Sequence, residues 1–323
     1  MTRRVAVTGA TGFIGWHVCE RFRDAGWAVR AVVRPGGRSA VPVGIEPAAA
    51  PLELAALTDA FRDVDTIVHL AGITQARRAV DFQRVNVDRT CTVAEATRAR
   101  GARLVYVSSQ TAGGPAPAAR PRTETDIPAP ITPYAASKLS GEHVVRQTNG
   151  LSWTILRPTA VYGPRDRRLL PLFRLARLGV FPRLPNAASF VLDLVHVQDV
   201  ARAIELAASS SVAEGETLFI GSGTQTTAES MLRELARACD RRYRPLRVPS
   251  ALVWLTALVG TVETRFRGRV VLAGLDFARL TEARSAGFAC SVERAQRCLG
   301  FRAQIGLTEG FQTTADWYRA NRW

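Results

Sequence analysis

The sequence predicts an α/β fold, built on a doubly wound parallel sheet with a smaller C-terminal lobe. Three observations lead to this prediction. Short β-branched runs alternate with helical segments from the first residues onward, and a glycine-rich turn directly follows the first run. After Arg157-Pro158 the sequence pattern changes. Strands that alternate with helices in this way are typical of parallel sheets, whose ligands bind at the carboxyl ends of the strands.

Each element follows from a local pattern. Strands are expected where β-branched and apolar residues run together, at 3–8, 28–33, 66–72, 103–109, 152–156 and 217–220. Helices are expected at 16–25, 54–61, 81–100, around Tyr134 and Lys138, and at 169–180, 195–208, 226–240, 249–260 and 308–321, with Thr308 as the cap of the last one. Residues 44–51 and 113–133 are expected to be connections, and 161–164 a turn.

Composition excludes several classes of protein. The first residues contain no apolar signal region, and the longest apolar run, 251–260, is too short to span a bilayer. The five cysteines are widely spaced without any CxxC pair, and the four histidines show no ligand spacing. We therefore expect no disulfide framework, no metal site and no transmembrane segment, and a reducing, cytoplasmic location.

The formal net charge of +15 indicates an anionic partner. The arginines are spread along the chain and interleaved with acids, and the densest clusters, 165–168 and 241–247, are short. This distribution argues against specific nucleic-acid binding. Attraction of an anionic cofactor or a small-molecule substrate accounts for the same charge.

The glycine-rich turn is the first candidate site. Gly9, Gly12 and Gly15 follow the strand at 3–8 and open the helix that comes next. In this context glycines let the backbone approach a pyrophosphate, and the helix N-terminus offers unpaired N–H groups. The alternative is a plain tight turn between strand and helix. The position of the trio directly after the first strand favours dinucleotide binding.

Arg34 stands where a dinucleotide-binding fold usually places an acid for the adenine ribose hydroxyls. A guanidinium there can bind a 2′-phosphate through two hydrogen bonds, whereas a carboxylate would repel the phosphate. The alternative is a solvated arginine in an arginine-rich chain. We expect NADP to be favoured over NAD.

Lys138 is the only lysine of the chain, and it lies one helical turn after Tyr134. An ammonium held near a phenol stabilises the phenolate, and is expected to lower its pKa from about 10 toward the working range of a general base. The alternative is a solvated helix face with an accidental tyrosine and lysine. The use of the single lysine at this spacing favours catalysis.

These motifs occur with others in a fixed order, and the chain resembles the extended short-chain dehydrogenase/reductase family, whose fold is of the Rossmann type. The segments that carry the resemblance are Thr8–Gly15, His69–Gly72, Asn86-Val87, Val107–Ser109, Tyr134–Lys138, Leu156–Pro158, Val161–Pro164, Val195–Val200, Gly306–Gly310 and Trp317-Tyr318. They span nearly the whole chain. The resemblance implies a dinucleotide-binding domain at 1–164 plus 191–221 and a substrate-binding lobe at 165–190 plus 222–323.

The resemblance also implies residue roles. Ser109 would hydrogen-bond the substrate oxygen, Tyr134 would move its proton, and Lys138 would lower the phenol's pKa and hold the nicotinamide ribose. The implied cofactor-binding set is Gly9, Thr11, Gly12, Phe13, Ile14, Gly15, Arg34, Leu70, Ala71, Gly72, Asn86, Tyr134, Lys138, Pro158 and Val161. Thr74 and Thr111 are candidates for the substrate pocket, and His69 is expected to be a packed strand residue.

Three functions remain open. The first is an NADP-preferring oxidoreductase acting on a secondary alcohol or ketone of a fairly apolar, steroid-like substrate, since 248–260 and 294–301 resemble the branch with 3β-hydroxysteroid dehydrogenases and dihydroflavonol reductases. The second is a nucleoside-diphosphate-sugar epimerase or dehydratase with tightly held NAD, which Ala112-Gly113-Gly114 after the serine loop disfavours. The third is a non-catalytic dinucleotide sensor, against which the Tyr134/Lys138 pair argues. A homodimer is expected.

Overall fold

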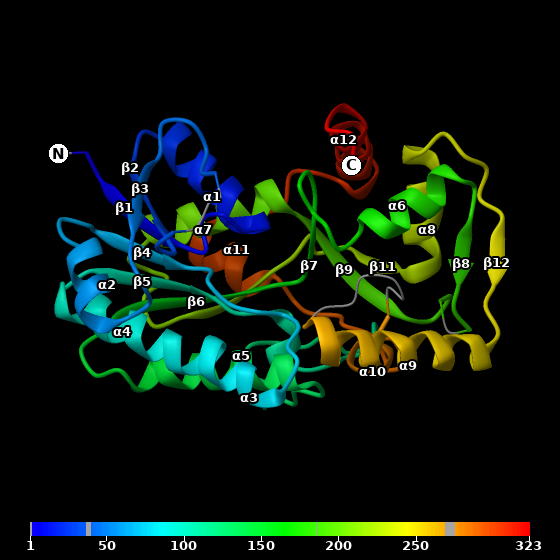
Figure 1. The fold of residues 1–323 in the computed structure, drawn as a ribbon, viewed down its shortest axis with the longest axis horizontal. Coiled ribbons are helices and arrows are strands. Elements are labelled where there is room, and N and C mark those ends of the chain that lie inside the picture. The colour runs from blue at the N-terminus through cyan, green and yellow to red at the C-terminus, as the bar shows by residue number, and fades with distance from the viewer. Residues whose placement is uncertain (1, 37–39, 186, 269–274) are drawn as a thin grey trace.

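A seven-stranded parallel sheet forms the centre of the larger part of the molecule (Figure 1). The computed structural model describes residues 2–36, 40–185, 187–268 and 275–323. The strands pair in the order β10-β6-β5-β4-β1-β2-β3. Their bounds are Arg4–Thr8 (β1), Ala28–Val33 (β2), Glu46–Ala49 (β3), Thr66–His69 (β4), Arg103–Val107 (β5), Ser152–Pro158 (β6) and Thr217–Ile220 (β10). The predicted doubly wound parallel sheet is confirmed.

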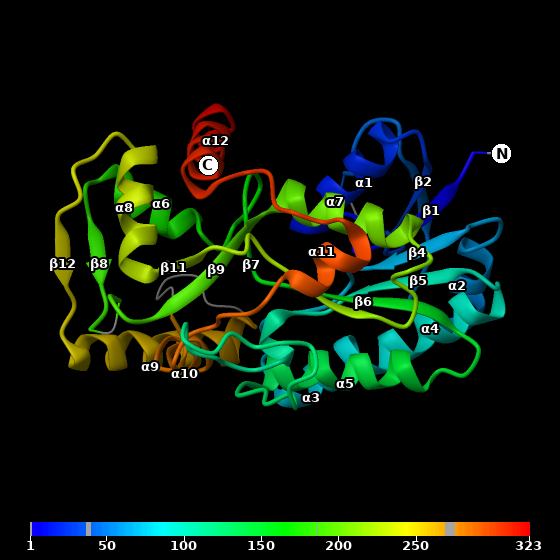
Figure 2. The same cartoon turned by 180° about the vertical axis from the view of Figure 1, so that it is seen from behind.

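Helices cover both faces of this sheet (Figures 1 and 2). One face carries α1 (Phe13–Asp24), α7 (Val197–Ser209) and α11 (Glu293–Leu299). The other carries α2 (Leu54–Ala60), α4 (Arg89–Ala99) and α5 (Pro133–Gln147). Because both faces are covered, the inner strands are apolar along nearly their whole length, without the alternation of a half-exposed strand.

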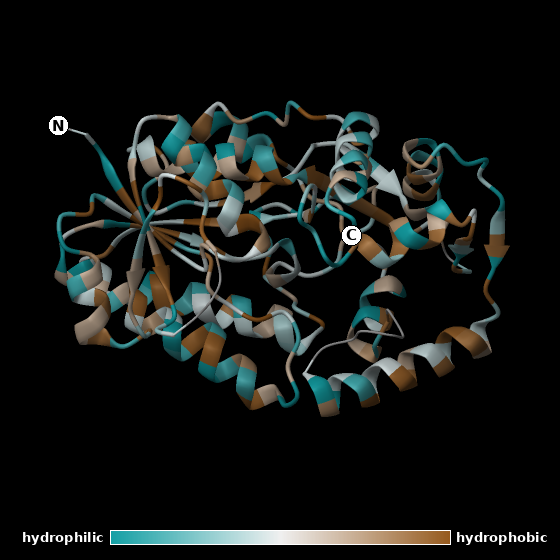
Figure 3. Cartoon of the chain, turned by 45° about the horizontal axis from the view of Figure 1, so that its top comes forward, coloured by the Kyte–Doolittle hydropathy of each residue, from teal (hydrophilic) through white to brown (hydrophobic). Residues whose placement is uncertain are grey.

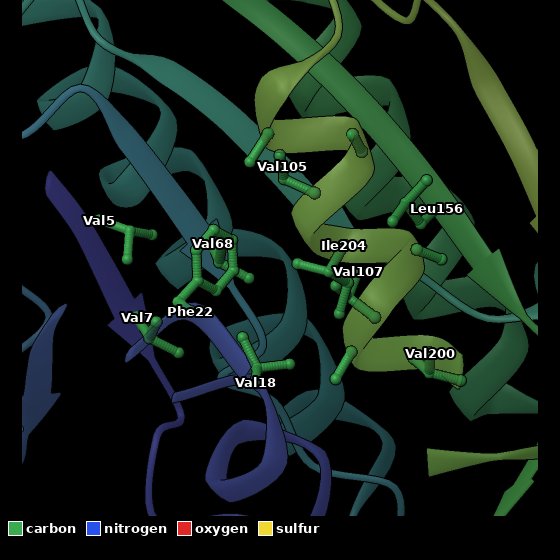
Figure 4. Packing of buried hydrophobic residues seen from close by; sticks show 14 of the residues in the cluster. Val5, Val7, Val18, Phe22, Val68, Val105, Val107, Leu156, Val200 and Ile204 are labelled. Atoms are coloured by element: carbon green, nitrogen blue, oxygen red, sulfur yellow. The ribbon is translucent and has the colours of Figure 1, made fainter. Parts of the chain in front are cut away.

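The core between the sheet and the first helix layer is made of branched aliphatic side chains (Figure 4). Strand residues meet residues of α1 and α7 there, and all of them are buried: Val5, Val7, Val68, Val105, Val107 and Leu156 from the sheet, Val18 and Phe22 from α1, and Val200 and Ile204 from α7. This layer holds α1 against the sheet, and with it the turn that links β1 to α1.

The connection expected at 44–51 contains a strand, and that expectation is wrong. β3 lies at the edge of the sheet, and among the strands that the structure describes it pairs only with β2, in parallel. Its sequence, Glu-Pro-Ala-Ala, has little intrinsic preference for a strand. Pro47 is tolerated because an edge strand has one side without ladder hydrogen bonds.

The single helix expected at 81–100 is divided by a change of helical pitch. A short helix α3 (Ala79–Phe82) leads into a π-helical segment η1 (Gln83–Asp88), which continues as α4. Such π segments frequently occur at functional sites because they displace one side chain from the regular register. Here the segment contains Asn86, which lies beneath the loop after β4.

The second part of the molecule contains two small sheets with helices around them. β7 (Ala160–Tyr162), β9 (Val191–His196) and β11 (Gln225–Thr227) form one sheet, and β8 (Phe181–Arg183) pairs with β12 (Pro245–Arg247). The helices are α6 (Leu170–Arg177), α8 (Ala228–Ala238), α9 (Ser250–Arg267), α10 (Phe277–Ala283) and α12 (Leu307–Ala320). The turn expected at 161–164 is therefore partly strand, and the helix expected from 195 begins at Val197.

The last helix begins one residue earlier than expected. Gly306 is the N-cap of α12, with extended backbone, and Thr308 lies inside the first turn. The Thr308 hydroxyl donates a hydrogen bond to the Glu234 carboxylate of α8 at 2.8 Å. The prediction of Thr308 as the cap is wrong because its side chain is used to join two helices. Among the described residues, no helix is long and apolar enough to cross a bilayer.

Candidate active site

The turn between β1 and α1 depends on its glycines. Gly9 has a φ of +74°, and its carbonyl accepts a hydrogen bond from the amide of Gly12 at 2.9 Å. A Cβ on Gly15 would lie 2.1 Å from the Gly9 oxygen. The turn therefore closes tightly enough for α1 to begin at Phe13, three residues before the expected start.

The N-terminus of α1 suits an anionic group. Its cap, Gly12, has no side chain to accept hydrogen bonds from the first amides, and Thr11 and Gly12 are exposed. The first N–H groups of a helix have no partner within the helix and carry the positive end of its dipole. The backbone of Phe13 and Ile14 could thus hold the pyrophosphate of a dinucleotide.

The loop after β4 lies against this turn. A Cβ on Gly9 would lie 2.7 Å from the amide nitrogen of Ala71, so the two backbones are in direct contact. β4 ends at His69, which leaves Leu70–Gly72 as loop where the sequence predicted strand. Gly72 is exposed, and this loop could line the same nucleotide.

Asn86 fixes the loop after β4 to the helix α5. Its side chain accepts a hydrogen bond from the amide of Ile73 (2.8 Å) and donates to the carbonyl of Ile73 (2.9 Å) and to the hydroxyl of Ser137 (2.9 Å). The amide group is almost fully buried. Asn86 therefore links the loop after β4 to α5 through hydrogen bonds to both.

Ser109 and Tyr134 meet at the carboxyl end of β5. β5 ends at Val107, and Ser109 caps the short 3₁₀ turn η2 (Gln110–Ala112). The Ser109 hydroxyl lies 2.9 Å from the Thr111 hydroxyl, and it is close enough to the Tyr134 phenol to act on the phenol's pKa, which it lowers. Tyr134 lies in the first turn of α5, after the N-cap Thr132.

Lys138 reaches the same strand end from the next turn of α5. Its ammonium donates to the carbonyl of Val107 at 2.8 Å and lies 4.4 Å from the centre of the Tyr106 ring. The side chain is buried, and burial lowers its pKa to about 7 against the opposing charge of Glu142. The i, i+4 spacing thus directs both Tyr134 and Lys138 toward β5.

The pKa of Tyr134 is shifted opposite to the expected direction. Burial raises it, and the Arg168 guanidinium and the Ser109 hydroxyl offset this rise only in part. The expectation that the pKa of Tyr134 is lowered is wrong, because desolvation of the half-buried phenol has the largest effect on it, and the sequence does not show this. Arg168 and Glu282 were not singled out as neighbours of Tyr134.

Glu282 approaches Tyr134 from α10 and raises the pKa of the phenol. Its carboxylate also accepts a hydrogen bond from Thr132 at 3.3 Å. Arg168, between β7 and α6, lies on the same side and acts in the opposite direction. Neither residue is close in sequence to Tyr134, so the spacing of residues could not predict that Glu282 lies near the phenol. For Arg168 the available sequence signal was its place in the arginine cluster 165–168.

A buried ion pair holds α5 against the sheet. The Glu142 carboxylate accepts hydrogen bonds from Arg157 Nε (2.8 Å) and Nη2 (2.7 Å), from Ser108 Oγ (2.6 Å) and from Arg146 (3.0 Å). Although burial opposes ionisation, Arg157 holds the pKa of Glu142 below its usual range. Glu142 lies four residues after Lys138, and that spacing was the available sequence signal for it.

Of the remaining predicted residues, two lie at strand ends of the large sheet and two lie outside that sheet. Arg34 directly follows β2 and is exposed, Pro158 ends β6, and Val161 is in β7. Thr74 is exposed beyond the loop after β4. Since β2, β1, β4, β5 and β6 are adjacent in the sheet, their carboxyl ends form one continuous edge.

His69 is a packed residue, as expected. It is fully buried, with Nδ1 2.6 Å from the Thr8 hydroxyl and Nε2 3.0 Å from the Thr90 hydroxyl. Burial lowers its pKa to about 3. Among the residues that the structure describes, no group of three or more His, Cys, Asp and Glu side chains is placed to hold a metal ion.

A glycine turn at the head of a doubly wound parallel sheet, with tyrosine and lysine at the end of β5, defines a nucleotide-binding protein of the Rossmann type. The sequence of residues 5–221 matches the NAD dependent epimerase/dehydratase family. The chain belongs to this family, within the extended short-chain dehydrogenases/reductases, and its members are NAD-dependent oxidoreductases and epimerases.

Three known proteins indicate the range of this similarity. A ceramide reductase of Caulobacter vibrioides is 31% identical over 99% of this chain and 95% of its own length. A 4-hydroxy-2-methyl-3-oxo-4-farnesyl-3,4-dihydroquinoline-1-oxide ketoreductase of Stigmatella aurantiaca is 32% identical over 71% of each chain. The structure of MoeE5 in complex with UDP-glucuronic acid and NAD superimposes with a TM-score of 0.77 at 27% identity, covering 98% of this chain and 99% of that one.

Proposed function

We propose that the protein is an NAD(P)-dependent oxidoreductase that reduces a ketone, or oxidises the corresponding secondary alcohol, on a fairly apolar substrate. The observation that supports this most is that Ser109, Tyr134 and Lys138 come together at the carboxyl end of β5, at the same edge of the sheet as the glycine turn that follows β1. The similarity to a ceramide reductase and to a farnesyl-bearing ketoreductase supports an apolar substrate.

The residues at this strand end have separate roles in the proposal. The bound nicotinamide supplies or accepts the hydride. In reduction, the phenol of Tyr134 donates its proton to the substrate's carbonyl oxygen, and the Ser109 hydroxyl donates a hydrogen bond to the same oxygen. The raised pKa of Tyr134 favours this direction because it keeps the phenol protonated near neutral pH. Thr111, in contact with Ser109, positions the serine.

We assign the cofactor to the continuous edge of strand ends. The amides of Phe13 and Ile14 would hold its pyrophosphate, Leu70–Gly72 would line it, and Lys138 would bind the nicotinamide ribose. The fit is supported by two backbone approaches that exclude any Cβ, at Gly9 and Gly15. Arg34 favours NADP over NAD, because its exposed guanidinium follows β2.

An apolar pocket supports the substrate class. It has a volume of about 540 Å³ and is lined by residues of three regions: Pro115 and Ile131 of the loop before α5, Trp254 of α9, and Phe277, Leu280, Thr281, Arg284, Ser285 and Ala286 on and after α10. Ile131 lies three residues before Tyr134. We assign this pocket, within a substrate-binding lobe at 165–190 and 222–323, to the apolar part of the substrate.

A second candidate function is epimerisation of a nucleoside-diphosphate sugar. It is favoured by the similarity to MoeE5, whose structure holds UDP-glucuronic acid and NAD, and by Arg168, whose charge is near enough to Tyr134 to lower the pKa of the phenol. An epimerase oxidises and re-reduces the same substrate, so it would be purified with bound NAD and would show no net change in NAD(P)H absorbance.

The experiment combines binding with turnover. Thermal stabilisation by NADP, NAD and UDP-sugars is compared first, since a ligand that binds the folded state raises its Tm. NADPH oxidation is then followed with long-chain ketones, and NADP reduction with ceramide, which carries a secondary alcohol. Tyr134→Phe should lower kcat by roughly 10²- to 10⁴-fold while keeping the stabilisation by NADP. Full turnover by Tyr134→Phe, or a larger Tm shift with UDP-sugars than with NADP, would reject the reductase.

A further inference from the structure

Helix α9 exposes its large apolar side chains and buries its small ones. The inward side consists of Val253, Ala257 and Gly260. The opposite side, here called the outer face of α9, carries seven apolar residues that are between 47% and 73% exposed: Leu252, Trp254, Leu255, Leu258, Val259, Val262 and Phe266. Figure 3 shows α9 at the margin of the molecule with apolar residues along most of its length.

These residues form a continuous stripe along the helix. Leu255, Val259, Val262 and Phe266 follow one another at intervals of four, three and four residues, which places them on one side. A surface helix of a globular protein normally turns such a stripe toward the core. A contiguous apolar patch that stays exposed marks an interaction surface.

The charge around the outer face is positive. Residues 241–267 contain six arginines and one acid, Glu263. The Glu263 side chain is only 7% exposed and pairs with Arg267 at 3.4 Å. Arg244 and Arg247 before the helix, and Arg265 and Arg267 at its end, are exposed. An approaching partner therefore meets arginines at both ends of the apolar stripe.

The positive charge indicates which kind of partner binds the outer face of α9. If two copies of α9 packed together, parallel or antiparallel, arginines would face arginines at the ends, without an exposed acid in 241–267 to neutralise them. Anionic lipid headgroups complement the same arginines. A helix with an apolar face, an aromatic residue and flanking arginines lies in the plane of a bilayer surface, with its apolar side in the acyl boundary.

We propose that the outer face of α9 docks the protein on the surface of a bilayer that contains anionic lipid. Trp254 belongs both to this face and to the apolar pocket, where the Arg284 guanidinium lies 5.1 Å from the centre of its ring. A docked molecule would thus hold the mouth of that pocket next to the bilayer. The docking itself does not depend on the proposed function, because it is measured without turnover.

The test is co-sedimentation of the full chain with vesicles. Vesicles of phosphatidylcholine alone are compared with vesicles that also contain phosphatidylglycerol, at low and high salt. We expect binding to the anionic vesicles that weakens as salt is raised. The double variant Leu255→Glu/Val259→Glu should bind at least about ten-fold more weakly, because two apolar side chains are withdrawn from the lipid.

A matched control carries the same charge change elsewhere. Val43 (89% exposed) and Val212 (67% exposed) lie outside α9, so Val43→Glu/Val212→Glu should bind like the unchanged protein. Unaltered Tm values show that both variants are folded. Quenching of tryptophan fluorescence by brominated anionic lipid should occur, and should diminish in Trp254→Phe.

Three results would overturn the proposal. The unchanged protein could remain in the supernatant with anionic vesicles at low salt. The α9 variant could bind as well as the control variant. Light scattering could show a dimer that Leu255→Glu/Val259→Glu converts to a monomer, which would assign the outer face to self-association.

Discussion

The hydroxyl of Thr132 donates a hydrogen bond to the carboxylate of Glu282 at 3.3 Å. Thr132 caps α5 two residues before Tyr134, and Glu282 belongs to α10 in the second part of the molecule. This hydrogen bond therefore joins α5, the helix that carries Tyr134, to α10 in the part of the molecule where we place the substrate. Because Glu282 also raises the pKa of Tyr134, the substrate side affects both the position and the proton affinity of the phenol.

Glu282→Gln and Arg168→Gln should shift the pH profile of oxidation in opposite directions. Loss of the carboxylate removes a charge that raises the pKa of Tyr134, whereas loss of the guanidinium removes one that lowers it. In kcat/KM for alcohol oxidation, the apparent pKa should fall in Glu282→Gln and rise in Arg168→Gln. Shifts of the same sign in both variants would show that Tyr134 is not the titrating group.

The strands show how far the sequence determines the fold. β2 and β10 were predicted to the residue, since both consist mainly of β-branched and apolar side chains. β3 was missed because the position of an edge strand depends on the neighbour that it pairs with. The helix at 81–100 was predicted as a unit, but its π segment depends on the contact of Asn86 with Ile73, which comes from another element.

In the candidate site, too, local features could be predicted from the sequence and contacts between distant segments could not. Tyr134 and Lys138 could be found because they lie on one helix at a fixed spacing, and the glycine turn because its three positions are local. Glu282 and Arg168 come from distant segments, so only the folded arrangement brings them to Tyr134. Burial of the phenol, which decides the direction of its pKa shift, likewise arises from packing and not from spacing.

Lys138 should make the stability of the protein depend on pH above neutrality. Burial lowers its pKa to about 7 from 10.5, so between these values the unfolded chain binds a proton that the folded chain lacks. The free energy of unfolding therefore rises with pH across this window. Relative to Lys138→Met, the wild type should gain on the order of 2 kcal/mol between about pH 7 and pH 9, as measured by urea unfolding. A difference that stays constant with pH would contradict the burial of a titrating lysine.

Arg34→Gln should change the choice of cofactor. Arg34 follows β2 at the edge assigned to the dinucleotide, and its guanidinium would pair with the 2′-phosphate. Binding of NADP, measured by titration calorimetry, should weaken roughly ten-fold, while binding of NAD stays unchanged. Arg98→Gln, at an exposed position of α4, is the matched control and should alter neither. Equal weakening of both cofactors in Arg34→Gln would remove the argument for NADP.

Gly141 should be required because Tyr106 occupies the space where a side chain would begin. A Cβ at position 141 would lie 2.4 Å from the Tyr106 hydroxyl and 3.0 Å from the Asn86 carbonyl oxygen. Gly141→Ala should lower the free energy of unfolding by about 1–3 kcal/mol, despite the better helix propensity of alanine. Tyr106→Phe removes the nearer oxygen but keeps the ring beneath Lys138. In urea unfolding, Tyr106→Phe/Gly141→Ala should therefore be more stable than the sum of the two single changes by about 1 kcal/mol. If the two changes are simply additive, the Asn86 carbonyl and not the phenol sets the distance between α5 and the sheet.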